Sequence, residues 1–354
     1  MTNSDSQEAT ATSGGGFPAC GDFADQGPLL AELEAGQEFI GFYLARNPRL
    51  DPFRDPTKGK YMRLQLRDCT GTIQARIWEG AEDAAEVIKE GGPIKVAGMV
   101  EVYNGQKQVQ IQRYRPAREG EFDPSRLLAT TSRDPEAMWA RVMAAVHGVR
   151  DPHLNALLRA FFDDIDTAAR FAEIPAARVI HHPYNSGLLE HCYELLRLAE
   201  PLLELYPEID ADLLTTGILL HDIGKLEEYA YGYDVDVTVS GKLIGHVVLS
   251  ERRVSAAIGR IDGFPPKREL EVIHMILAHH GRYEWGSPRR PKSLEAAALH
   301  YLDNLDAQVN RFNLLLAPAR ENGESWTQYD RLLGRVLYTG EGQGLSVEEN
   351  GYAE

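Results

Sequence analysis

The hydrophobic pattern of the chain changes its period about a third of the way along, and this change constrains the fold more than any other feature. Between residues 37 and 115 apolar and polar side chains alternate at period two, as in QEFIGFYLARN and PIKVAGMVEVY. Such alternation is typical of strands with one buried face. From Asp134 onward the apolar residues recur at the spacing of amphipathic helices. The sequence therefore predicts a β domain followed by an α domain.

The β segment divides into five predicted strands. Turn signals separate them at Asp68–Gly71 and at Asn104-Gly105, a strong hairpin marker. One helix-like insert, residues 81–89, falls between the third and fourth strands. Five strands with a helix after the third match the Greek-key barrel known as the OB-fold. We assign this all-β barrel to residues 36–116.

Sequence signals typical of helix N-termini occur at the start of the α domain. Asp134-Pro135 and Asp151-Pro152 each combine an N-cap residue with proline at the first helical position. Further amphipathic runs predict helices over residues 187–205, 210–221, 242–262, 266–280 and 293–316. The predicted all-α domain spans residues 134–338, and residues 117–133 form a linker.

Both ends of the chain are acidic. Residues 1–35 are rich in Ser, Thr, Gly and acids without Lys or Arg, and residues 339–354 have the same character. We predict that both are disordered tails. They account for −10 of the formal net charge of −16, whereas residues 36–116 come to about +3. The predicted barrel is therefore the part of the chain best suited to bind a polyanion.

Composition argues against a membrane or secreted protein. No apolar stretch is long enough to span a membrane, and the N-terminus lacks the regions of a secretory signal. The three cysteines, Cys20, Cys69 and Cys192, are too few and too scattered for a disulfide framework or a zinc ribbon. We expect a cytoplasmic protein with no membrane partner, and assembly into a homo-oligomer stays open.

Histidines concentrate in the α domain, where nine of the eleven lie between residues 181 and 300. A single histidine is more commonly a surface or core residue than a ligand. Several of these, however, fall on apolar helix faces or at helix ends, where an imidazole or carboxylate needs a partner. Together they indicate seven metal ligands: His191, His221, Asp222, His246, His279, His280 and Asp303.

Imidazoles mixed with carboxylates, and no cysteine, favour a catalytic metal site over a structural zinc site. Manganese is the first expectation, with Co, Fe, Ni, Mg and Zn as alternatives. Such a metal lowers the pKa of bound water and polarises a phosphoryl oxygen, and two ions ~3.5–4 Å apart can share these tasks. The expected chemistry is hydrolysis of a phosphoester by metal-activated water.

Short motifs in this region resemble the HD phosphohydrolase superfamily, whose pattern is H…HD…D. They are LLEH at 188–191, LLHDIGK at 219–225 and the later Asp303. The resemblance implies a first metal bound by His191, His221, Asp222 and Asp303. The additional His246 and His279-His280 resemble superfamily members that bind two metals bridged by Asp222.

A longer set of motifs is similar to the YhaM family of 3′→5′ exoribonucleases over roughly residues 37–316. It comprises HHPYNSGLLEH, LLHDIGKLEE, IGHVVLSE, ILAHHGRYEWGSPRRP and EAAALHYLDNLDA. This resemblance implies an N-terminal OB-fold and a C-terminal HD domain. It also implies degradation of single-stranded RNA, and of DNA as a further substrate, from the 3′ end to 5′-mononucleotides.

Other residues of the α domain are candidates for contact with the substrate. Asp222 and Lys225 are predicted to be catalytic, with Lys225 stabilising phosphorane charge; a solvated lysine at a helix end is the alternative. His182 is expected to contact substrate or to protonate the leaving oxygen, unless it has a structural role in its loop. Arg282 and Glu284 are expected to point into the site, while His181, His274 and His300 are assigned to structure.

An OB-fold binds a single strand through stacking aromatics and a basic groove. The stacking candidates are Phe42, Tyr61, Trp78 and Tyr103, with the barrel core as the alternative location for several of them. The phosphate-binding candidates are Lys58, Lys60, Arg63, Arg76 and Lys107. The loop over residues 51–60 is predicted to act as a mobile clamp.

Two other functions stay open. The first is an HD-type phosphodiesterase or phosphohydrolase of small nucleotides, which would use the same ligands. The OB-fold argues against it, because a small substrate needs no groove. The second is a non-catalytic nucleic-acid-binding protein with a structural HD domain, which the complete set of ligands disfavours.

Overall fold

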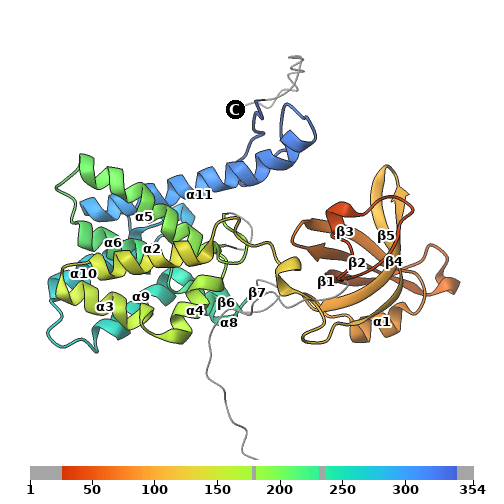
Figure 1. Ribbon diagram of the computed structural model, residues 1–354, viewed down its shortest axis with the longest axis horizontal. Helices are drawn as coiled ribbons and strands as arrows, with labels where there is room; N and C mark the ends of the chain where they lie inside the picture. The colour runs from red at the N-terminus through yellow and green to blue at the C-terminus, as the bar shows by residue number, and fades with distance from the viewer. Residues whose placement is uncertain (1–25, 178–180, 231–235, 341–354) are drawn as a thin grey trace, which may run out of the picture. The chain divides into compact units, whose positions relative to one another are not determined.

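The computed structural model describes residues 26–177, 181–230 and 236–340 (Figure 1). These residues form two compact units that divide between Leu127 and Leu128. The first unit is a β-barrel and the second is a helical bundle, as the change of period predicts. In these ranges the structure contains no helix that is both long enough and apolar enough to cross a membrane.

Five strands close the barrel in the order β1-β2-β3-β5-β4. They are β1 (Glu38–Pro52), β2 (Lys60–Asp68), β3 (Gly71–Ile77), β4 (Pro93–Tyr103) and β5 (Gln106–Pro116). The pairing of β3 with β5 is parallel, and the other four pairings are antiparallel. Helix α1 (Ala81–Val87) lies between β3 and β4, where the sequence predicts it. This arrangement is the OB-fold.

Local sequence explains both the pairing and the core of the barrel. Asn104 and Gly105 have φ values of 50° and 77°, and they form the tight turn between β4 and β5. Asparagine and glycine adopt positive φ at little cost, which fixes this hairpin. Along β4 every second side chain is buried, as in Ile94, Val96 and Val100. The alternation places one face of the strand in the barrel core.

Residues 26–35, expected to belong to a disordered tail, instead pack on the barrel. They contain the short 3-10 helix η1 (Leu30–Glu32). Leu30 and Leu33 are buried in the barrel core, and the backbone N–H of Leu30 donates to Asp68 Oδ2 at 2.6 Å. Burial of two leucines offsets the entropy lost when the segment is ordered. Thr339, at the start of the tail predicted over residues 339–354, is also buried, and its hydroxyl donates to the carbonyl of Glu324 at 2.7 Å. The remaining parts of the two predicted tails, residues 1–25 and 341–354, lie outside the described residues.

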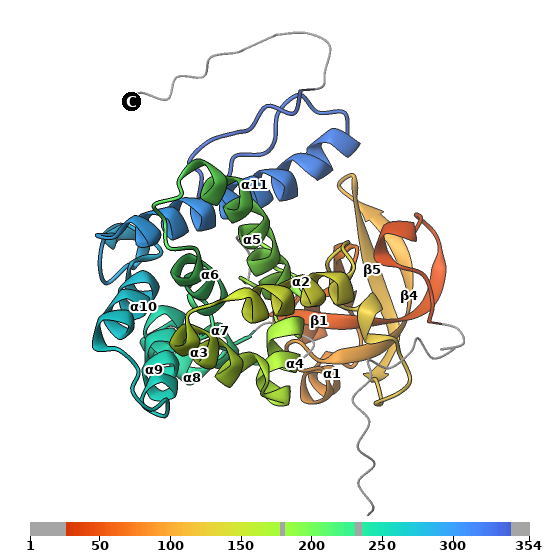
Figure 2. The same ribbon diagram turned by 60° about the vertical axis from the view of Figure 1, so that its left-hand side comes forward.

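The helical unit follows a connection that holds η3 (Pro124–Arg126). Helices α5, α6 and α11 contact one another, and α10 packs against α6, α9 and α11 (Figures 1 and 2). The helices are α2 (Pro135–Gly148), α3 (Pro152–Phe162), α4 (Ile165–Glu173), α5 (Gly187–Leu205), α6 (Ala211–Leu220), α7 (Lys225–Glu228), α8 (Val239–Ile244), α9 (His246–Ile258), α10 (Pro266–Ala278) and α11 (Leu294–Glu321). A short ribbon of β6 (Tyr229–Ala230) and β7 (Asp236–Val237) lies between α7 and α8.

The predicted helix starts are present. The side chains of Asp134 and Asp151 accept hydrogen bonds from backbone N–H groups in the first turns of α2 and α3. The helix predicted over residues 242–262 is wrong as a single element, because Gly245, with φ 79°, separates α8 from α9. The break matters for function, since it makes His246 the first residue of a helix.

Candidate metal centre

All seven predicted metal ligands lie together in the helical unit, most of them at helix ends. His221 follows the last residue of α6, and His279 follows the last residue of α10. His246 begins α9, while His191 and Asp303 lie within α5 and α11. Where a helix ends, consecutive residues such as His221 and Asp222 are free to point toward the same site.

Four of these residues form a first group of donor atoms. The Nε2 atom of His191 lies 3.3 Å from His221 Nε2 and 3.4 Å from Asp303 Oδ1. The Oδ2 atom of Asp222 lies 3.3 Å from His221 Nε2 and 3.9 Å from His191 Nε2. Ligand atoms that are each about 2.0–2.2 Å from one ion have separations of roughly 3–4 Å. The first group therefore has the spacing of a single coordination sphere.

A second group of donor atoms, all imidazole nitrogens, lies near the other carboxylate oxygen of Asp222. The Oδ1 atom of Asp222 lies 3.5 Å from His246 Nε2 and 3.8 Å from His279 Nε2. His246 Nε2 in turn lies 3.3 Å from His280 Nε2. The two oxygens of one carboxylate thus face two different sets of imidazoles, which is the arrangement expected of a residue that bridges two ions.

Each of the five imidazoles in these two groups directs its Nδ1 atom at an oxygen. The distances are 2.6–3.0 Å, and the acceptors are the carbonyls of Ile218, Ile276 and Trp285 and the carboxylates of Glu228 and Asp306. A hydrogen bond from Nδ1 fixes the tautomer and leaves the Nε2 lone pair for a metal. The five Nε2 atoms are therefore oriented as metal ligands.

Two buried polar atoms at the centre of the site have no hydrogen-bond partner among the residues that the structure describes. They are Asp222 Oδ1 and His279 Nε2, which lie 3.8 Å apart. Burying such atoms unpaired is costly, and a cation between them would satisfy both. The donor set of imidazoles and carboxylates fits a divalent metal.

Electrostatics favours the metal-binding form of three of these ligands, His279, His280 and Asp222. Burial lowers the pKa of His279 and of His280, so both imidazoles stay neutral. Burial opposes ionisation of Asp222, but the charges of Lys225 and His221 hold the pKa of this carboxyl well below its usual range. The buried Lys225 donates from Nζ to Asp222 Oδ2 at 2.5 Å.

The pKa of His191 is shifted in the opposite direction from that of His279 and His280. Burial alone would lower its pKa, but hydrogen bonds to Asp303 and Asp306 raise the pKa of His191 to about 10. A metal ligand must be deprotonated at the coordinating atom, so a metal that bound at His191 would compete with a proton.

A pocket of about 330 Å³ opens beside both groups of donors. Among the predicted site residues it is lined by Asp222, Lys225, His279, His280 and Asp303. Residues not predicted as part of the site complete the lining: His181, Trp285, His300, Asn304 and Ala307. The volume lies at the lower end of the ~300–1,000 Å³ range of small-ligand sites.

The structure exchanges the expected roles of two neighbouring histidines. His182, expected to contact substrate or protonate the leaving group, is fully buried. It has a φ of 43°, and its Nε2 atom lies 2.9 Å from Asp306 Oδ2. His181, assigned to structure, instead lines the pocket, and neither of its ring nitrogens has a partner among the described residues. The left-handed backbone at His182 turns the two side chains to different sides, which sequence spacing does not reveal.

Three further expectations in this unit need correction. Arg282 and Glu284 are exposed and do not line the pocket. His300 lines it, while its Nδ1 atom donates to the carbonyl of His279 at 2.8 Å. His274 has the structural role assigned to it, because its Nε2 atom accepts from the backbone N–H of Lys292.

Asp306 is a functional residue that the sequence reasoning missed. It is buried, and its Oδ2 atom accepts hydrogen bonds from His191 Nδ1 at 2.7 Å and His182 Nε2 at 2.9 Å. One signal could have indicated it, because Asp306 lies three residues after Asp303 and thus on the same helix face. Glu228, which holds His246, carried no comparable signal.

On the barrel, the predicted stacking residues differ in how far their side chains are exposed. Phe42 is only 7% exposed and packs on Phe122, so its assignment to the binding surface is wrong. Tyr61 and Trp78 are half-buried and cluster with Phe53, with ring centroids 4.9–5.8 Å apart. Tyr103 is 56% exposed at the β4–β5 hairpin.

The predicted phosphate-binding residues are similarly mixed. Lys107 donates from Nζ to the carbonyl of Leu33 at 2.7 Å, so it anchors the N-terminal segment. The guanidinium of Arg76 lies over the rings of Trp78 and Tyr103, at 5.4 and 5.5 Å from their centroids. Lys58 and Lys60 are exposed in and beside the loop predicted to be a clamp, which contains η2 (Pro56–Lys58). Contact of these residues with a substrate stays a prediction.

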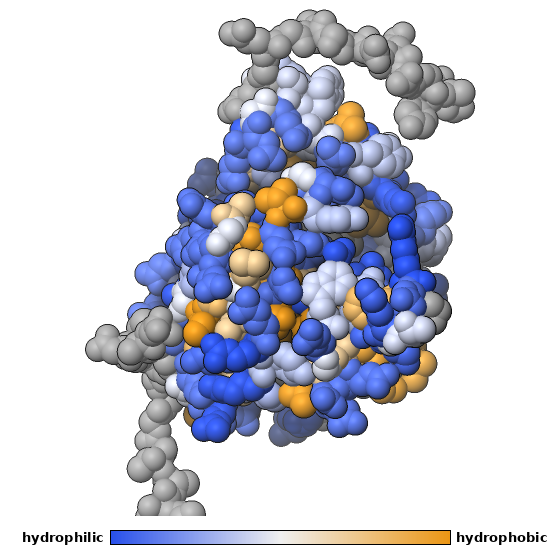
Figure 3. Space-filling view, turned by 90° about the vertical axis from the view of Figure 1, so that its right-hand side faces the viewer, coloured by the Kyte–Doolittle hydropathy of each residue, from blue (hydrophilic) through white to orange (hydrophobic). Residues whose placement is uncertain are grey.

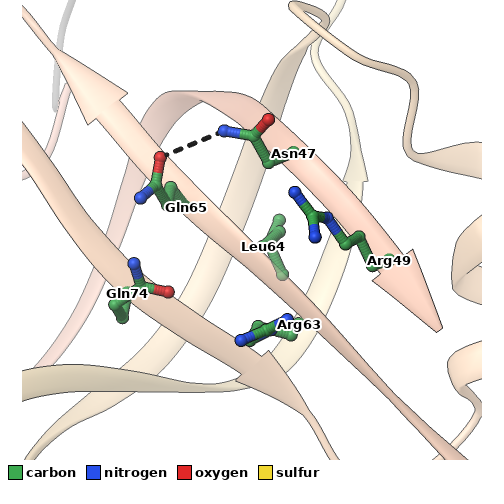
Figure 4. Close-up of a pocket in the computed structure, with 6 residues that line it drawn as sticks. All are labelled: Asn47, Arg49, Arg63, Leu64, Gln65 and Gln74. Carbon is green, nitrogen blue, oxygen red and sulfur yellow. Dashed lines mark hydrogen bonds between the residues drawn. The ribbon is translucent and has the colours of Figure 1, made fainter. Parts of the chain in front are cut away.

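A small polar pocket of about 200 Å³ lies across β1, β2 and β3 (Figure 4). It is lined by Asn47, Arg49, Arg63, Leu64, Gln65 and Gln74. Arg63 is the one predicted site residue among them, and it also pairs with Asp51 at 3.0 Å. Figure 3, seen from the barrel side of Figure 1, shows mostly hydrophilic side chains with separate hydrophobic spots.

Comparison with known proteins agrees with both halves of this description. Residues 188–308 match the HD domain, a range that contains all seven predicted ligands, and residues 54–117 match an OB-fold nucleic acid binding domain. A protein from Geobacillus sp. named 3′-5′ exoribonuclease YhaM is 32% identical over 82% of this chain and 89% of its own length.

This chain belongs to the YhaM family. A relative of the same name from Bacillus subtilis is 33% identical over 78% of this chain and 88% of its own length. The relative from Bacillus pumilus has the same identity and coverage. Membership confirms the resemblance found in the sequence motifs. An HD domain implies that the YhaM-type chain binds a divalent metal, for which the helical unit supplies the donor atoms.

Proposed function

We propose that the protein is a metal-dependent 3′→5′ exonuclease that hydrolyses single-stranded RNA, and DNA as a further substrate, to 5′-mononucleotides. The observation that carries the proposal is the convergence of four imidazole Nε2 atoms on the two oxygens of Asp222, with His280 Nε2 next to His246 Nε2, beside a pocket of about 330 Å³. The 3′→5′ polarity is supported by the relatives named 3′-5′ exoribonuclease.

The two groups of donor atoms support a site for two ions, in which His191, His221 and Asp303 would hold one ion on one side of Asp222. His246, His279 and His280 lie on the other side. Manganese suits this mixture of imidazole and carboxylate, and Co, Fe, Ni, Mg and Zn are alternatives. A divalent metal in this site supplies a water of lowered pKa and polarises a phosphoryl oxygen.

The protein's own side chains position the substrate and the ligands. Lys225 lines the pocket next to Asp222, so its ammonium is placed to stabilise charge that develops on phosphoryl oxygens. His181 lines the same pocket, and its ring nitrogens have no hydrogen-bond partner among residues 26–177, 181–230 and 236–340, so they are candidates to hydrogen-bond a substrate oxygen. His182 and Asp306 act one step further out, because they hold His191 in place.

The size of the pocket supports action at the end of a strand. A volume of about 330 Å³ lies at the lower end of the range of small-ligand sites, which favours a single terminal group over a longer stretch of strand. The barrel unit supports a strand-like substrate, since its family match is an OB-fold nucleic acid binding domain. Its exposed Tyr103 and the Arg76 guanidinium that lies over the Tyr103 ring offer stacking and charge to that strand.

Digestion of one single-stranded RNA, labelled in separate samples at its 5′ or its 3′ end, tests this proposal. With Mn²⁺ the 3′ label should appear at once in mononucleotides, while the 5′ label should stay on products that shorten gradually. Asp222→Asn should abolish both changes.

Asp212→Asn is the matched control, because Asp212 accepts backbone hydrogen bonds from Arg150 and Asp151 in the same unit. It should leave digestion intact. Early release of the 5′ label, internal fragments, or intact RNA with every metal tried would refute the proposal.

A further inference from the structure

A loop that follows the histidines at the end of α10 presents a tryptophan at the mouth of the metal pocket. The side chain of Trp285 is 45% exposed, yet it lines this pocket together with Asp222, His279 and His280. Large aromatic side chains are normally buried, and an exposed one beside a pocket with converging polar groups is typical of a ligand contact.

Hydrogen bonds hold this loop rigidly against α10. The backbone N–H groups of Trp285 and Ser287 both donate to the carbonyl of Arg282 at 3.1 Å. Ser287 is 3% exposed, and its hydroxyl donates to the carbonyl of Leu277 at 3.1 Å. Gly286 has a φ of 80°, which allows the tight turn between them. The backbone that carries the indole is therefore held in place before any ligand arrives, which lowers the entropic cost of binding.

The same residue is coupled to the metal centre. The carbonyl of Trp285 accepts a hydrogen bond from His280 Nδ1 at 2.9 Å, and its ring centroid lies 6.1 Å from that of His300. The backbone of Trp285 thus orients a candidate ligand while its ring borders the pocket. A nucleotide whose phosphate lies at the donor atoms has its base within reach of this ring.

The surroundings of the ring favour a nucleotide over an apolar ligand. The guanidinium of Arg282 lies 4.7 Å from the ring centroid of Trp285. Residues 281–292 carry Arg282, Arg289, Arg290 and Lys292 against Glu284 alone, for a net charge of +3. The stretch 117–338 that contains them is −9. An aromatic face supported by arginine, in a local cluster of positive charge, is the combination with which proteins bind single-stranded nucleic acid.

We propose that Trp285 is the platform on which the base of the 3′-terminal nucleotide stacks, with Arg282 supporting the ring and the basic loop contacting the strand's phosphates. This inference rests on the proposed exonuclease function, and it deepens that function by placing the terminal base. Every base has a π face, so such a platform tolerates all four bases. That tolerance suits an enzyme that removes each nucleotide in turn.

Two RNAs of identical length and sequence test the platform, one with an intact 3′-terminal nucleotide and the other with an abasic ribose there. The wild-type protein with Mn²⁺ should have a kcat/KM for the intact terminus about 5- to 150-fold above that for the abasic terminus, the range for one stacked base. Trp285→Ala should have the same kcat/KM for the two RNAs. Trp285→Phe should restore part of the difference.

Trp326→Ala is the matched control. Trp326 is 46% exposed and stacks on Tyr338 outside the pocket. This variant should keep the wild-type ratio between the two RNAs. If Trp285→Ala does not fold, Trp285→Leu removes the aromatic face and keeps apolar bulk. This variant, too, should have the same kcat/KM for the intact and the abasic terminus.

Equal rates of the wild type on the two RNAs would overturn the inference, as would a Trp285 variant without an aromatic ring that keeps the ratio. A wild type that hydrolyses neither RNA would instead refute the proposed exonuclease function. The two failures are therefore distinguishable.

Discussion

Asp306 links two buried histidines, and replacing it tests how the first group of ligands is held. Its Oδ2 atom accepts hydrogen bonds from His191 Nδ1 at 2.7 Å and from His182 Nε2 at 2.9 Å, and the side chain is 5% exposed. Asp306→Asn preserves the shape of the side chain and removes its charge. The amide oxygen is a weaker acceptor, so His191 should be held less firmly in the orientation that binds a metal.

The magnitude follows from these two contacts. A hydrogen bond to a charged group contributes ~1.5–3 kcal/mol and one between neutral groups ~0.5–1.5 kcal/mol. Weakening both bonds should therefore cost roughly 2 kcal/mol in total. Removing a residue that orients a metal-ligating histidine typically lowers metal affinity by about 10- to 100-fold, or ~1.4–2.8 kcal/mol. The two estimates agree, and we expect a loss of affinity in this range.

The assay is titration of chelator-treated protein with Mn²⁺ by calorimetry, alongside thermal unfolding of each variant. Asp212→Asn again serves as the control, because Asp212 also accepts two hydrogen bonds, at 2.8 and 3.0 Å, from backbone N–H groups. It should lose stability without losing metal affinity. The reasoning fails if Asp306→Asn binds Mn²⁺ within twofold of wild type, or if Asp212→Asn weakens binding equally.

Three further predictions concern stability. Gly224→Ala would place a Cβ atom 2.3 Å from the His246 carbonyl oxygen and 2.4 Å from the Ser250 nitrogen. Since both are backbone atoms, the free energy of unfolding should fall by roughly 1–3 kcal/mol, and an unchanged urea midpoint would contradict this. Asp151→Ala removes the N-cap of α3 and should cost ~0.5–2 kcal/mol near neutral pH. Burial opposes ionisation of Asp151, but backbone hydrogen bonds and the charge of Arg268 lower its pKa. Its contribution is therefore present above the unfolded pKa and lost as pH falls through the folded pKa, so wild type and variant should converge in acid; a constant difference would argue against this cause. Finally, Mn²⁺ at 100 times its Kd should stabilise the protein by ~2.7 kcal/mol, and a Tm insensitive to both metal and chelator would count against the metal centre.

Periodicity and turn chemistry were sufficient to predict the fold class. The run over residues 187–205 predicted a helix, and α5 has those bounds. The Asn104-Gly105 pair predicted the β4–β5 hairpin correctly, because positive φ is a local property of these residues. Local sequence signals gave wrong predictions where tertiary contacts determine the structure. Gly245 interrupts a run that reads as one helix, and residues 26–35 become ordered because two leucines find the barrel core.

For the candidate site, too, some residues could be predicted from local sequence and others could not. Ligands on helix faces and at helix ends could be located from spacing, so all seven predicted ligands lie together in the structure. The positions of side chains in loops could not be predicted from spacing, because the direction of these side chains depends on backbone angles such as the left-handed φ of His182. Asp306 and the proposed platform Trp285 were missed because Asp306 contacts His182 and His191, and Trp285 lines a pocket together with Asp222, all of which are distant in the sequence.

Product analysis in ¹⁸O-labelled water tests the central claim most directly. The full-length protein, loaded with Mn²⁺, is incubated with single-stranded RNA, and the released nucleotides are analysed by mass spectrometry. Hydrolysis at the terminal phosphodiester by water predicts nucleoside 5′-monophosphates that each carry one ¹⁸O atom in the phosphate. Release of 3′-monophosphates or cyclic phosphates, 5′-monophosphates without ¹⁸O, or no nucleotide at all would contradict the account.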